Sequence, residues 1–491
     1  MLNELLVTDI VKNFPFEPTA EQLSVIEAVS KFVISTNQRR LFVLRGYAGT
    51  GKTTLVGALV KTLVQHRKKV VLMAPTGRAA KVFSLYSEMA TQTIHKRIYR
   101  QKSISEQYEF VLNVNTMKDT LFFVDEASMI SNGGYDESIF GSGRLLDDLI
   151  QFVYSGKGCA LFLIGDTAQL PPIGQYLSPA LSTDALTGYG LNVEEMDMVQ
   201  VMRHIEQSGI LYNATALREV ISPAVMSKFT ESSVFNFKFR LKGFSDIMSI
   251  NGEDLIEEIG GCYSRDGIEE SVVVCRSNKR AIRYNNGIRA TILGREDEIN
   301  GGDHVMIVKN NYFWIEKLEE ELKQSGSDDQ LPFSFIANGD TAIVKRVRKK
   351  RELHGFHFMD ALLEFPDYGD FEIETILLTD ALFSEAPALT KEENEKLFFS
   401  FMKDYVDTPR KRDRFRKIRE DKHFNAFQVK FAYAVTCHKA QGGQWRNVFI
   451  DQGYITQQTQ NAEYYRWLYT ALSRATKRVY LVNWPEIQIT R

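Results

Sequence analysis

One segment of the chain has the residue types and spacing of a phosphate-binding loop. Gly46, Gly51, Lys52 and Thr53 form the pattern G-x-x-x-x-G-K-T, between an apolar run at 41–44 and a helical pattern that starts at 55. Glycines let successive backbone N–H groups face a phosphate, the lysine neutralises β- and γ-phosphate oxygens, and the threonine hydroxyl can ligate Mg²⁺. The segment therefore predicts a site for a nucleoside triphosphate.

Polar residues follow two further apolar runs. Asp125 and Glu126 come directly after LFFV at 121–124, and Gln169 lies in GDTAQLPPI at 165–173. Side chains at the carboxyl ends of parallel strands lie where such sheets bind ligands. Asp125 could hold the water shell of Mg²⁺, Glu126 could accept a proton from an attacking water, and Gln169 could orient that water. These residues predict hydrolysis of the triphosphate.

Transfer of a phosphoryl group also needs positive charge from an opposing surface. Arg203 in VQVMRH and Arg474 in YTALSRA are the candidates, and Arg474 lies in an amphipathic helical pattern. Taken alone, each arginine is more typical of a surface salt bridge than of a catalytic role, so the residues themselves leave both interpretations open.

The elements that must position these groups follow from hydrophobic patterning. A helix is expected at 19–35 after Thr19. Buried strands are expected at 41–44, 70–75, 121–126 and 160–166, each followed by a polar tip and separated by helical stretches. This alternation predicts an α/β fold with a parallel, doubly wound sheet. A second such block begins near 192, with strands expected at 271–278, within 427–442, and at 478–484.

Two insertions interrupt this pattern. Residues 97–115 predict two short polar strands around a Ser/Glu-rich turn, and 301–345 predict a small β-barrel with Gly-Asp turns. Two basic runs follow: 345–351 has six Lys or Arg in seven positions, and 403–422 has nine Lys or Arg against five Asp or Glu. We interpret these runs as solvated surface at this stage.

Composition limits the class of protein. The 491 residues exceed one ordinary domain, and 44% hydrophobic with 25% charged residues is typical of a globular chain. Sixty basic against sixty-two acidic residues give a formal charge of −2, so nucleic acid could be bound only by local basic surface. Four cysteines without metal-ligand spacing predict reduced thiols. The longest apolar run, 159–164, is too short for a membrane span, and we expect a cytoplasmic protein that does not bind membranes.

The order of motifs resembles one family closely. GYAGTGKTT, APTGRAAK at 74–81, TIH at 93–95, DEAS at 125–128, GDTAQLPPI, VMRH, TCHKAQG at 436–442 and YTALSRA at 469–475 occur in the order found in superfamily 1 DNA helicases. Within these, the chain resembles the RecD/Dda-like group of superfamily 1B, which moves 5′ to 3′ on single strands. The Pif-type helicases share much of this pattern. Residues 206–260 and 352–426 match no motif.

The resemblance implies roles for residues in the nucleotide site. Lys52, Glu126, Gln169, Arg203 and Arg474 would be catalytic, with the two arginines reaching across a cleft between domains. Thr53 and Asp125 would hold Mg²⁺, Gln22 would read adenine, and Gln441 would couple the nucleotide to the DNA strand. The residues expected to contact ATP are Gln22, Gly46, Ala48, Gly49, Thr50, Gly51, Lys52, Thr53, Thr54, Gln441 and Gly442.

The resemblance also implies a DNA path and a domain plan. The residues expected to bind DNA are Pro75, Thr76, Arg78, His95, Thr436, His438 and Phe110, with Phe110 as the wedge of a strand-splitting pin. Two RecA-like domains are expected, the first at 1–192 with the pin inserted at about 97–119. The second is expected at 193–295 and 425–491, with an SH3-like barrel inserted at 296–424.

Three functions remain open at this stage. The first is an ATP-dependent DNA helicase acting on single-stranded DNA and on duplexes with a 5′ tail, with ATP and Mg²⁺ as cofactors. The second is a single-strand translocase or remodeller that does not unwind duplexes. The third, a DNA-binding scaffold with ATP as a mere ligand, does not account for Glu126, since a binding protein needs no carboxylate to activate water.

Overall fold

The first sheet is parallel and has the strand order β3-β2-β6-β7-β1-β8. The computed structural model describes residues 2–101, 110–133, 141–201, 207–221, 237–326, 331, 335–456 and 460–490. The strands of this sheet are β1 Arg40–Gly46, β2 Lys69–Ala74, β3 Thr91–Thr93, β6 Thr120–Val124, β7 Ala160–Gly165 and β8 Asn192–Met198. All described pairings among them are parallel, as predicted.

Helices cover both faces of this sheet because its central strands contain continuous apolar runs. Leu41 and Val43 face one side with α5 Ile94–Ile98, α6 Leu145–Ser155 and α7 Thr183–Thr187. Phe42 and Leu44 face the other side with α1 Leu2–Asn13, α2 Ala20–Ile34, α3 Lys52–Gln65 and α4 Gly77–Ser87. Successive side chains of a strand point to opposite faces, so a continuous apolar run requires cover on both.

The second sheet is also parallel, in the order β10-β19-β18-β11-β17. Its strands are β10 Ile247–Ile250, β11 Ser271–Cys275, β17 Ala434–Thr436, β18 Trp445–Asp451 and β19 Ala475–Val482. Its helices are α8 Gly209–Ile221, α10 Leu255–Asp266, α11 Asn278–Gly287, α16 Cys437–Ala440 and α17 Ala462–Leu472, and a short parallel pair joins β9 Phe239–Arg240 to β20 Ile489–Thr490. The prediction of two parallel-sheet units is confirmed.

A closed barrel forms the third unit, which confirms the expected insertion. Its strands are β12 His304–Ile307, β13 Thr341–Leu353, β14 Phe356–Phe365, β15 Phe371–Leu378 and β16 Phe427–Phe431. Its accompanying helices are α12 Phe313–Ser325, α13 Asp380–Phe383, α14 Lys391–Asp404 and α15 Lys411–Arg419. The barrel reaches well beyond 345, the end predicted from the turn pattern.

One strand prediction is wrong in this region. Residues 427–442 were expected to contribute a strand to the second sheet alone, whereas β16 closes the barrel and only β17 joins the sheet. In β16 the apolar residues Phe427, Val429 and Phe431 alternate with Gln428 and Lys430, and all five are buried. This alternation is typical of a strand with one apolar face and differs from the continuous apolar runs of the parallel core strands.

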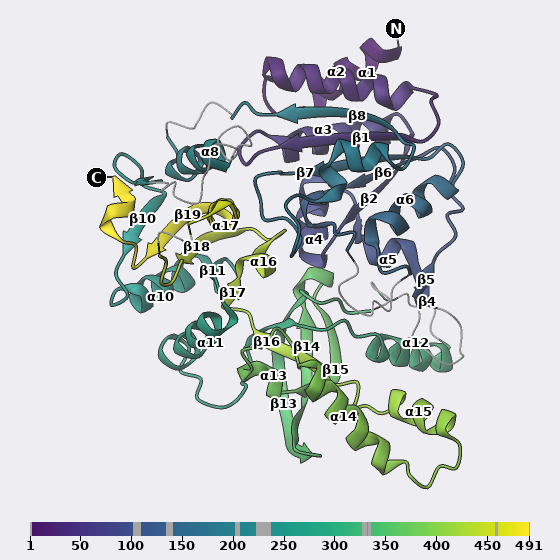
Figure 1. The fold of residues 1–491 in the computed structure, drawn as a ribbon, viewed down its shortest axis with the longest axis vertical. Coiled ribbons are helices and arrows are strands. Elements are labelled where there is room, and N and C mark those ends of the chain that lie inside the picture. Colours follow the sequence, from purple (N-terminus) through teal and green to yellow (C-terminus); the bar gives the residue numbers. More distant parts are fainter. Residues whose placement is uncertain are drawn as a thin grey trace.

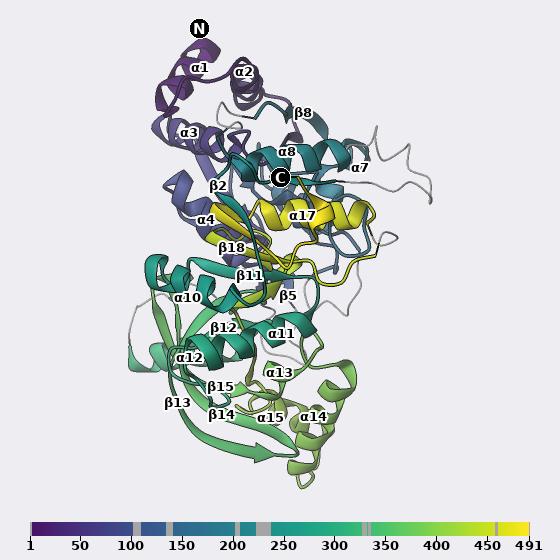
Figure 2. The same ribbon diagram turned by 90° about the vertical axis from the view of Figure 1, so that its left-hand side faces the viewer.

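The inserted hairpin is present as β4 Tyr99–Gln101 and β5 Phe110–Leu112, which pair antiparallel. Its turn lies outside the described residues. Figure 1 shows the two parallel sheets side by side, the barrel below them, and the hairpin strands above α12 on one side of the molecule. The view turned by 90° shows the barrel below the sheets as well (Figure 2).

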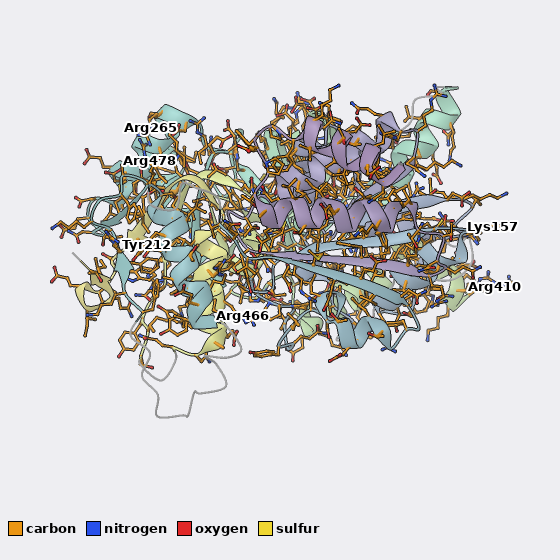
Figure 3. The ribbon with its side chains drawn as sticks, turned by 90° about the horizontal axis from the view of Figure 1, so that it is seen from above. Lys157, Tyr212, Arg265, Arg410, Arg466 and Arg478 are labelled. Atoms are coloured by element: carbon orange, nitrogen blue, oxygen red, sulfur yellow. The ribbon has the colours of Figure 1, made fainter. Side chains whose placement is uncertain are left out.

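Seen from above, the helices of the first sheet lie over its strands, and Arg265 and Arg478 lie at the opposite end of the molecule from Lys157 and Arg410 (Figure 3). All four cysteines are buried and none forms a disulfide. Among the helices that the structure describes, none is both long enough and apolar enough to cross a membrane.

Candidate active site

The phosphate-binding loop connects the end of β1 to the start of α3. Gly49 and Gly51 have φ angles of 77° and 83°, in the left-handed region that favours glycine. The ammonium of Lys52 donates to the carbonyl oxygens of Gly46 and Tyr47, the latter at 2.9 Å. A Cβ at Gly46 would lie 2.7 Å from the Lys52 side chain. The loop glycines therefore hold the lysine directly over the loop.

The two predicted carboxylates follow β6. A backbone bond from Asp125 N to Met73 O (3.0 Å) extends the sheet by one residue. Asp125 accepts from the Glu126 amide at 2.8 Å and from the Tyr86 hydroxyl. Burial and the nearby charge of Glu126 raise the pKa of Asp125 to about 6. The positive φ of Glu126, 52°, turns its side chain away from the strand direction.

Gln169 follows β7 and is buried. Its amide N–H bonds to Asp166 O at 3.4 Å, and its side-chain Oε1 is buried without a hydrogen-bond partner among the described residues. A buried, unpartnered amide oxygen is costly unless a ligand or water satisfies it. The side chain is therefore placed to contact a bound molecule.

Arg474 reaches this site from the second sheet. It lies between α17 and β19, is 4% exposed, and its guanidinium is 3.6 Å from Glu126 Oε1. Bonds to Thr470 O (3.2 Å) and Gly443 O (3.3 Å) fix its direction. The predicted arginine across the cleft is thus brought against a predicted catalytic carboxylate.

A cavity of about 270 Å³ lies between the two sheets. The predicted residues that line it are Ala48, Gly49, Gly51, Lys52, Thr53, Asp125, Glu126, Gln169, Gly442 and Arg474, and Tyr86, Asp166 and Gln444 also line it. Gln22, Gly46, Thr50, Thr54 and Gln441 are not among its lining residues. Gly442 has a φ of 72°, and a Cβ there would lie 2.8 Å from Ala79, so only glycine fits at this approach of the two domains.

Two of the residues predicted to contact the nucleotide form side-chain hydrogen bonds within the protein. Gln22 forms a capping box with Thr19, and its Nε2 donates to the Thr50 carbonyl at 3.1 Å. Gln441 Nε2 donates to Leu170 O at 2.7 Å, which joins the second sheet to the segment after β7. The adenine role of Gln22 stays a prediction.

Sequence reasoning missed Tyr469 and its neighbours in the same motif as Arg474. The Tyr469 hydroxyl accepts from the Ala48 amide of the phosphate-binding loop and donates to Asp166, both at 2.7 Å. Thr470 Oγ1 accepts from Leu170 N at 2.8 Å. The signal was available, because these residues lie four and five positions before Arg474 in the same motif, but their partners are distant in sequence.

The predicted DNA residues on the two sheets follow the carboxyl ends of strands. Pro75 and Thr76 follow β2, Thr76 caps α4, and the Arg78 guanidinium lies 3.9 Å from the ring centre of Trp445. Burial lowers the pKa of His95 to about 4, so its imidazole is neutral at pH 7. Their DNA contacts stay predictions.

Thr436 ends β17, and His438 lies in α16, the helix that follows it. Burial lowers the pKa of His438 from its usual value. The DNA contacts expected of these two residues likewise stay predictions.

Two site predictions had other outcomes. Arg203 lies outside the described residues. Phe110 is 7% exposed, and its ring centre is 4.3 Å from that of Tyr312, which precedes α12. Phe110 therefore packs in a core at the base of the hairpin, against a residue about 200 positions away in the sequence. Its role as a wedge stays a prediction.

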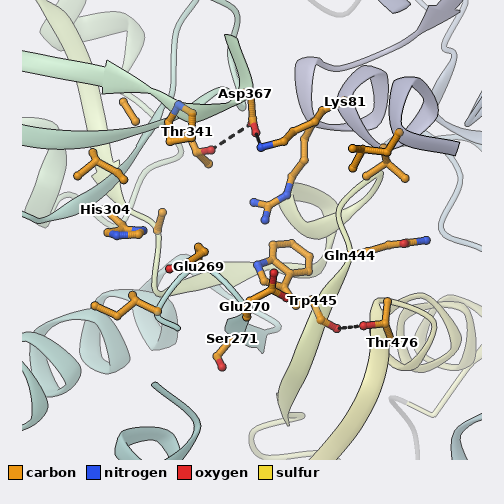
Figure 4. A pocket seen from close by; sticks show the side chains of 18 of the residues that line it. Lys81, Glu269, Glu270, Ser271, His304, Thr341, Asp367, Gln444, Trp445 and Thr476 are labelled. Atoms are coloured by element: carbon orange, nitrogen blue, oxygen red, sulfur yellow. Dashed lines mark hydrogen bonds and ion pairs between the residues drawn. The ribbon is translucent and has the colours of Figure 1, made fainter. Parts of the chain in front are cut away.

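A larger cavity of about 820 Å³ adjoins the first and shares with it Thr53, Val82, Tyr86 and Gln444. It lies between α4, the second sheet and the barrel, and Lys81 and Asp367 pair within it at 2.7 Å (Figure 4). Glu269 and Glu270 also line it. Carboxylates repel phosphate groups, so this larger cavity is unsuited to a triphosphate.

Comparisons with known proteins agree with this geometry. Residues 19–219 match the family model of an AAA domain, and 431–482 match that of the UvrD-like helicase C-terminal domain. The uncharacterized protein R530 of Acanthamoeba polyphaga mimivirus is 21% identical over 91% of this chain and 96% of its own length. The ATP-dependent DNA helicase dda of Enterobacteria phage T4 is 22% identical over 83% of this chain and 86% of its own.

The ATP-dependent RecD2 DNA helicase of Deinococcus radiodurans is 28% identical over 42% of this chain, which spans 24% of that relative's length. A solved structure of the Pif1 helicase from Bacteroides, in complex with ADP-AlF3 and single-stranded DNA, aligns with a TM-score of 0.45 and 15% identity, covering 96% of this chain and 94% of that one.

The fold and the cavity define a P-loop NTPase with two RecA-like sheets and an inserted barrel. With the matches to both sheets and to RecD2 and dda, the resemblance to superfamily 1B helicases of the RecD/Dda-like group, derived from the motifs, is confirmed.

Proposed function

We propose that this protein hydrolyses ATP to move 5′ to 3′ along single-stranded DNA and to unwind duplex DNA. The observation that carries the proposal is that one cavity contains the phosphate-binding loop and carboxylates of the first sheet together with Arg474 of the second. ATP bound there would hold the two sheets together, and its hydrolysis would release them. The relatives whose names include DNA helicase support DNA as the substrate.

Each side chain in the cavity has a distinct role in this proposal. Lys52 neutralises the β- and γ-phosphate oxygens, while Gln169 orients the attacking water with its unpartnered oxygen. Glu126 accepts the proton that this water loses as it attacks the γ-phosphorus. Arg474 stabilises the charge that develops on the transferring group. Arg203 would join it from the second domain, on the strength of the resemblance.

The site fits Mg²⁺ bound together with the nucleotide. Thr53 and Asp125 both line the cavity, and the described residues contain no cluster of three or more His, Cys, Asp or Glu that could hold a metal by itself. Mg²⁺ characteristically takes one or two protein ligands and completes its shell with phosphate oxygens and water. The ion would supply positive charge to the β- and γ-phosphates.

Coupling between hydrolysis and movement would pass through the contacts across the cleft. Tyr469, Thr470 and Gln441 each bond to the first sheet or the segments that follow its strands. Opening of the cleft must break these bonds, and closing must restore them. Alternating grips on the strand by the two sheets would convert this cycle into motion.

Strand displacement on tailed duplexes tests the proposal. Duplexes with a 5′ tail, a 3′ tail or blunt ends are mixed with protein and ATP, and release of a labelled strand is followed. We expect release from the 5′-tailed duplex alone, and none with Glu126→Gln, which keeps the shape of the side chain. Release from the 3′-tailed duplex alone would refute the direction, and DNA-stimulated hydrolysis without any strand release would leave a translocase that does not unwind.

A further inference from the structure

The helices α14 and α15 form a small unit of their own, here named the arm (residues 391–425). The arm lies between β15 and β16 of the barrel, in a region without any recognised motif. Phe415 of α15 stacks on Phe398 of α14 with ring centres 5.5 Å apart, and Phe401 contacts Phe358 of the barrel at 6.4 Å. The arm is therefore held in a defined position on the barrel.

The outer surface of α15 is strongly basic in a protein whose net charge is −2. Residues 409–422 contain eight Lys or Arg and three Asp or Glu. Six of these basic side chains are exposed, namely Arg410, Lys411, Arg412, Arg416, Lys417 and Lys422. Two acidic side chains lie close to Arg416: Asp413 at 3.8 Å and Glu420 at 3.9 Å. Lys411 and Lys417 form no salt bridge within the described part of the chain.

Some of these positive charges lie where the helix itself gains nothing from them. Arg410, Lys411 and Arg412 stand at its N-terminus, where the helix dipole is positive, and Arg412 and Arg416 are like charges four residues apart. The ammonium of Lys317 on α12 lowers the pKa of Lys422. Asp413 in the first turn and the basic residues of the last turn suit the dipole, so it is the excess of exposed positive charge that indicates a polyanionic partner.

The arm connects to the base of the hairpin through α12. Asn425, at the end of the arm, accepts through its carbonyl oxygen from Asn311 Nδ2 (2.8 Å) and Trp314 Nε1 (2.9 Å). Tyr312, between these two residues, packs against Phe110 of β5. Figure 1 shows the hairpin strands, α12 and α15 on the same side of the molecule. A partner held by α15 would thus lie on the hairpin side.

We propose that the basic face of α15 binds the phosphate backbone of duplex DNA ahead of the point where the strands separate. This inference rests on the proposed function. Single-strand binding surfaces combine basic side chains with exposed aromatic rings on which bases stack. The one aromatic residue of α15, Phe415, is instead stacked on Phe398. Phosphate contacts without stacking suit a duplex.

Equilibrium DNA binding by the full chain without nucleotide tests the inference. The variant Arg412→Gln/Arg416→Gln/Lys417→Gln removes three charges and keeps good helix formers. A matched control, Lys31→Gln/Lys61→Gln/Lys68→Gln, removes three exposed lysines from α2 and α3 and the turn after α3. The probes are a forked duplex with a 5′ tail and the tail strand alone, at several salt concentrations.

We expect the arm variant to bind the fork about tenfold more weakly, with a salt slope smaller by up to about three, since each phosphate contact contributes roughly 0.9. Its affinity for the single strand and its DNA-stimulated ATP turnover should stay within about twofold of the unmodified protein, as should all properties of the control. Equal unfolding temperatures would show that all three proteins are folded.

Unchanged fork affinity in the arm variant would overturn the inference, as would an equal loss for fork and single strand, which would make the arm a single-strand contact. An equal loss of fork affinity in the control would mean that overall charge causes the effect, and this would also overturn the inference. The proposed function fails separately: it would fail if DNA did not stimulate ATP turnover in the unmodified protein, whatever the arm binds.

Discussion

Two neighbouring cavities of this protein share Thr53 and Tyr86 but differ in chemistry. The smaller contains backbone amides of a glycine loop, one lysine and one arginine, two carboxylates that can serve an ion and a water, and Asp166, which accepts from the Tyr469 hydroxyl. The larger has about three times the volume but is lined by Glu269, Glu270, Glu364, Asp367 and Asp370, against Arg78 and Lys81. Volume alone would select the wrong site, because a triphosphate needs positive charge and amide donors.

Substitution of Arg474, the arginine across the cleft, should have the largest effect on ATP turnover. Arg474→Ala removes positive charge from the developing γ-phosphate charge, and we expect DNA-stimulated turnover to fall by about 10³-fold or more. Arg478→Ala, on the next strand and at the edge of the molecule (Figure 3), is the matched control and should turn over normally. Phosphate release under saturating ATP measures both, and normal turnover by Arg474→Ala would contradict the account.

Substitution of Glu126, the carboxylate that faces Arg474, should have the second-largest effect on turnover. Glu126→Gln keeps the size of the side chain but cannot accept a proton from water, so we expect turnover to fall by about 10²- to 10³-fold. Nucleotide affinity, measured by calorimetry with a nonhydrolysable analogue, should be retained. Loss of affinity with unchanged turnover per bound ATP would show that Glu126 serves binding and not proton transfer.

Tyr469 should have a moderate effect. Tyr469→Phe removes a hydroxyl that bonds to Ala48 and Asp166 while the ring stays in the core, and each such bond contributes about 0.5–1.5 kcal/mol. We expect a roughly tenfold loss in kcat/KM for ATP. Tyr464→Phe on the same helix, whose hydroxyl bonds to Gln452 within the second domain, is the control. If the two substitutions had equal effects on kcat/KM, the proposed role of Tyr469 across the cleft would be contradicted.

A substitution in the larger cavity should have the smallest effect on ATP turnover and affinity. Glu270→Gln removes a negative charge there, and we expect ATP turnover and affinity to change by less than about twofold, since no phosphate lies beside it. A clear gain in ATP affinity would mean that this carboxylate repels the triphosphate and that the nucleotide enters the larger cavity. Steady-state kinetics over a range of ATP concentrations decides between the outcomes.

Much of this arrangement could be predicted from the sequence. Lys52, Asp125 and Glu126 each follow a buried strand within local patterns, and the parallel topology brings strand ends together. Arg474 needed the family resemblance, because an isolated arginine on a helix has no local signature. Its partner Glu126 lies about 350 residues away.

The remaining features depend on contacts that no local pattern encodes. Phe110 is buried by Tyr312, Tyr469 bonds to a loop amide in the other domain, and the two polar residues of β16 are buried in the barrel. In each case the environment is provided by a distant segment.

Phosphate release by the unmodified protein, with and without a single-stranded oligonucleotide, tests the central claim most directly. If one triphosphate is held by charges from both RecA-like sheets, DNA that bridges the sheets must change how the cleft closes and should raise the rate of hydrolysis severalfold or more. A rate that is the same with and without DNA would contradict the account.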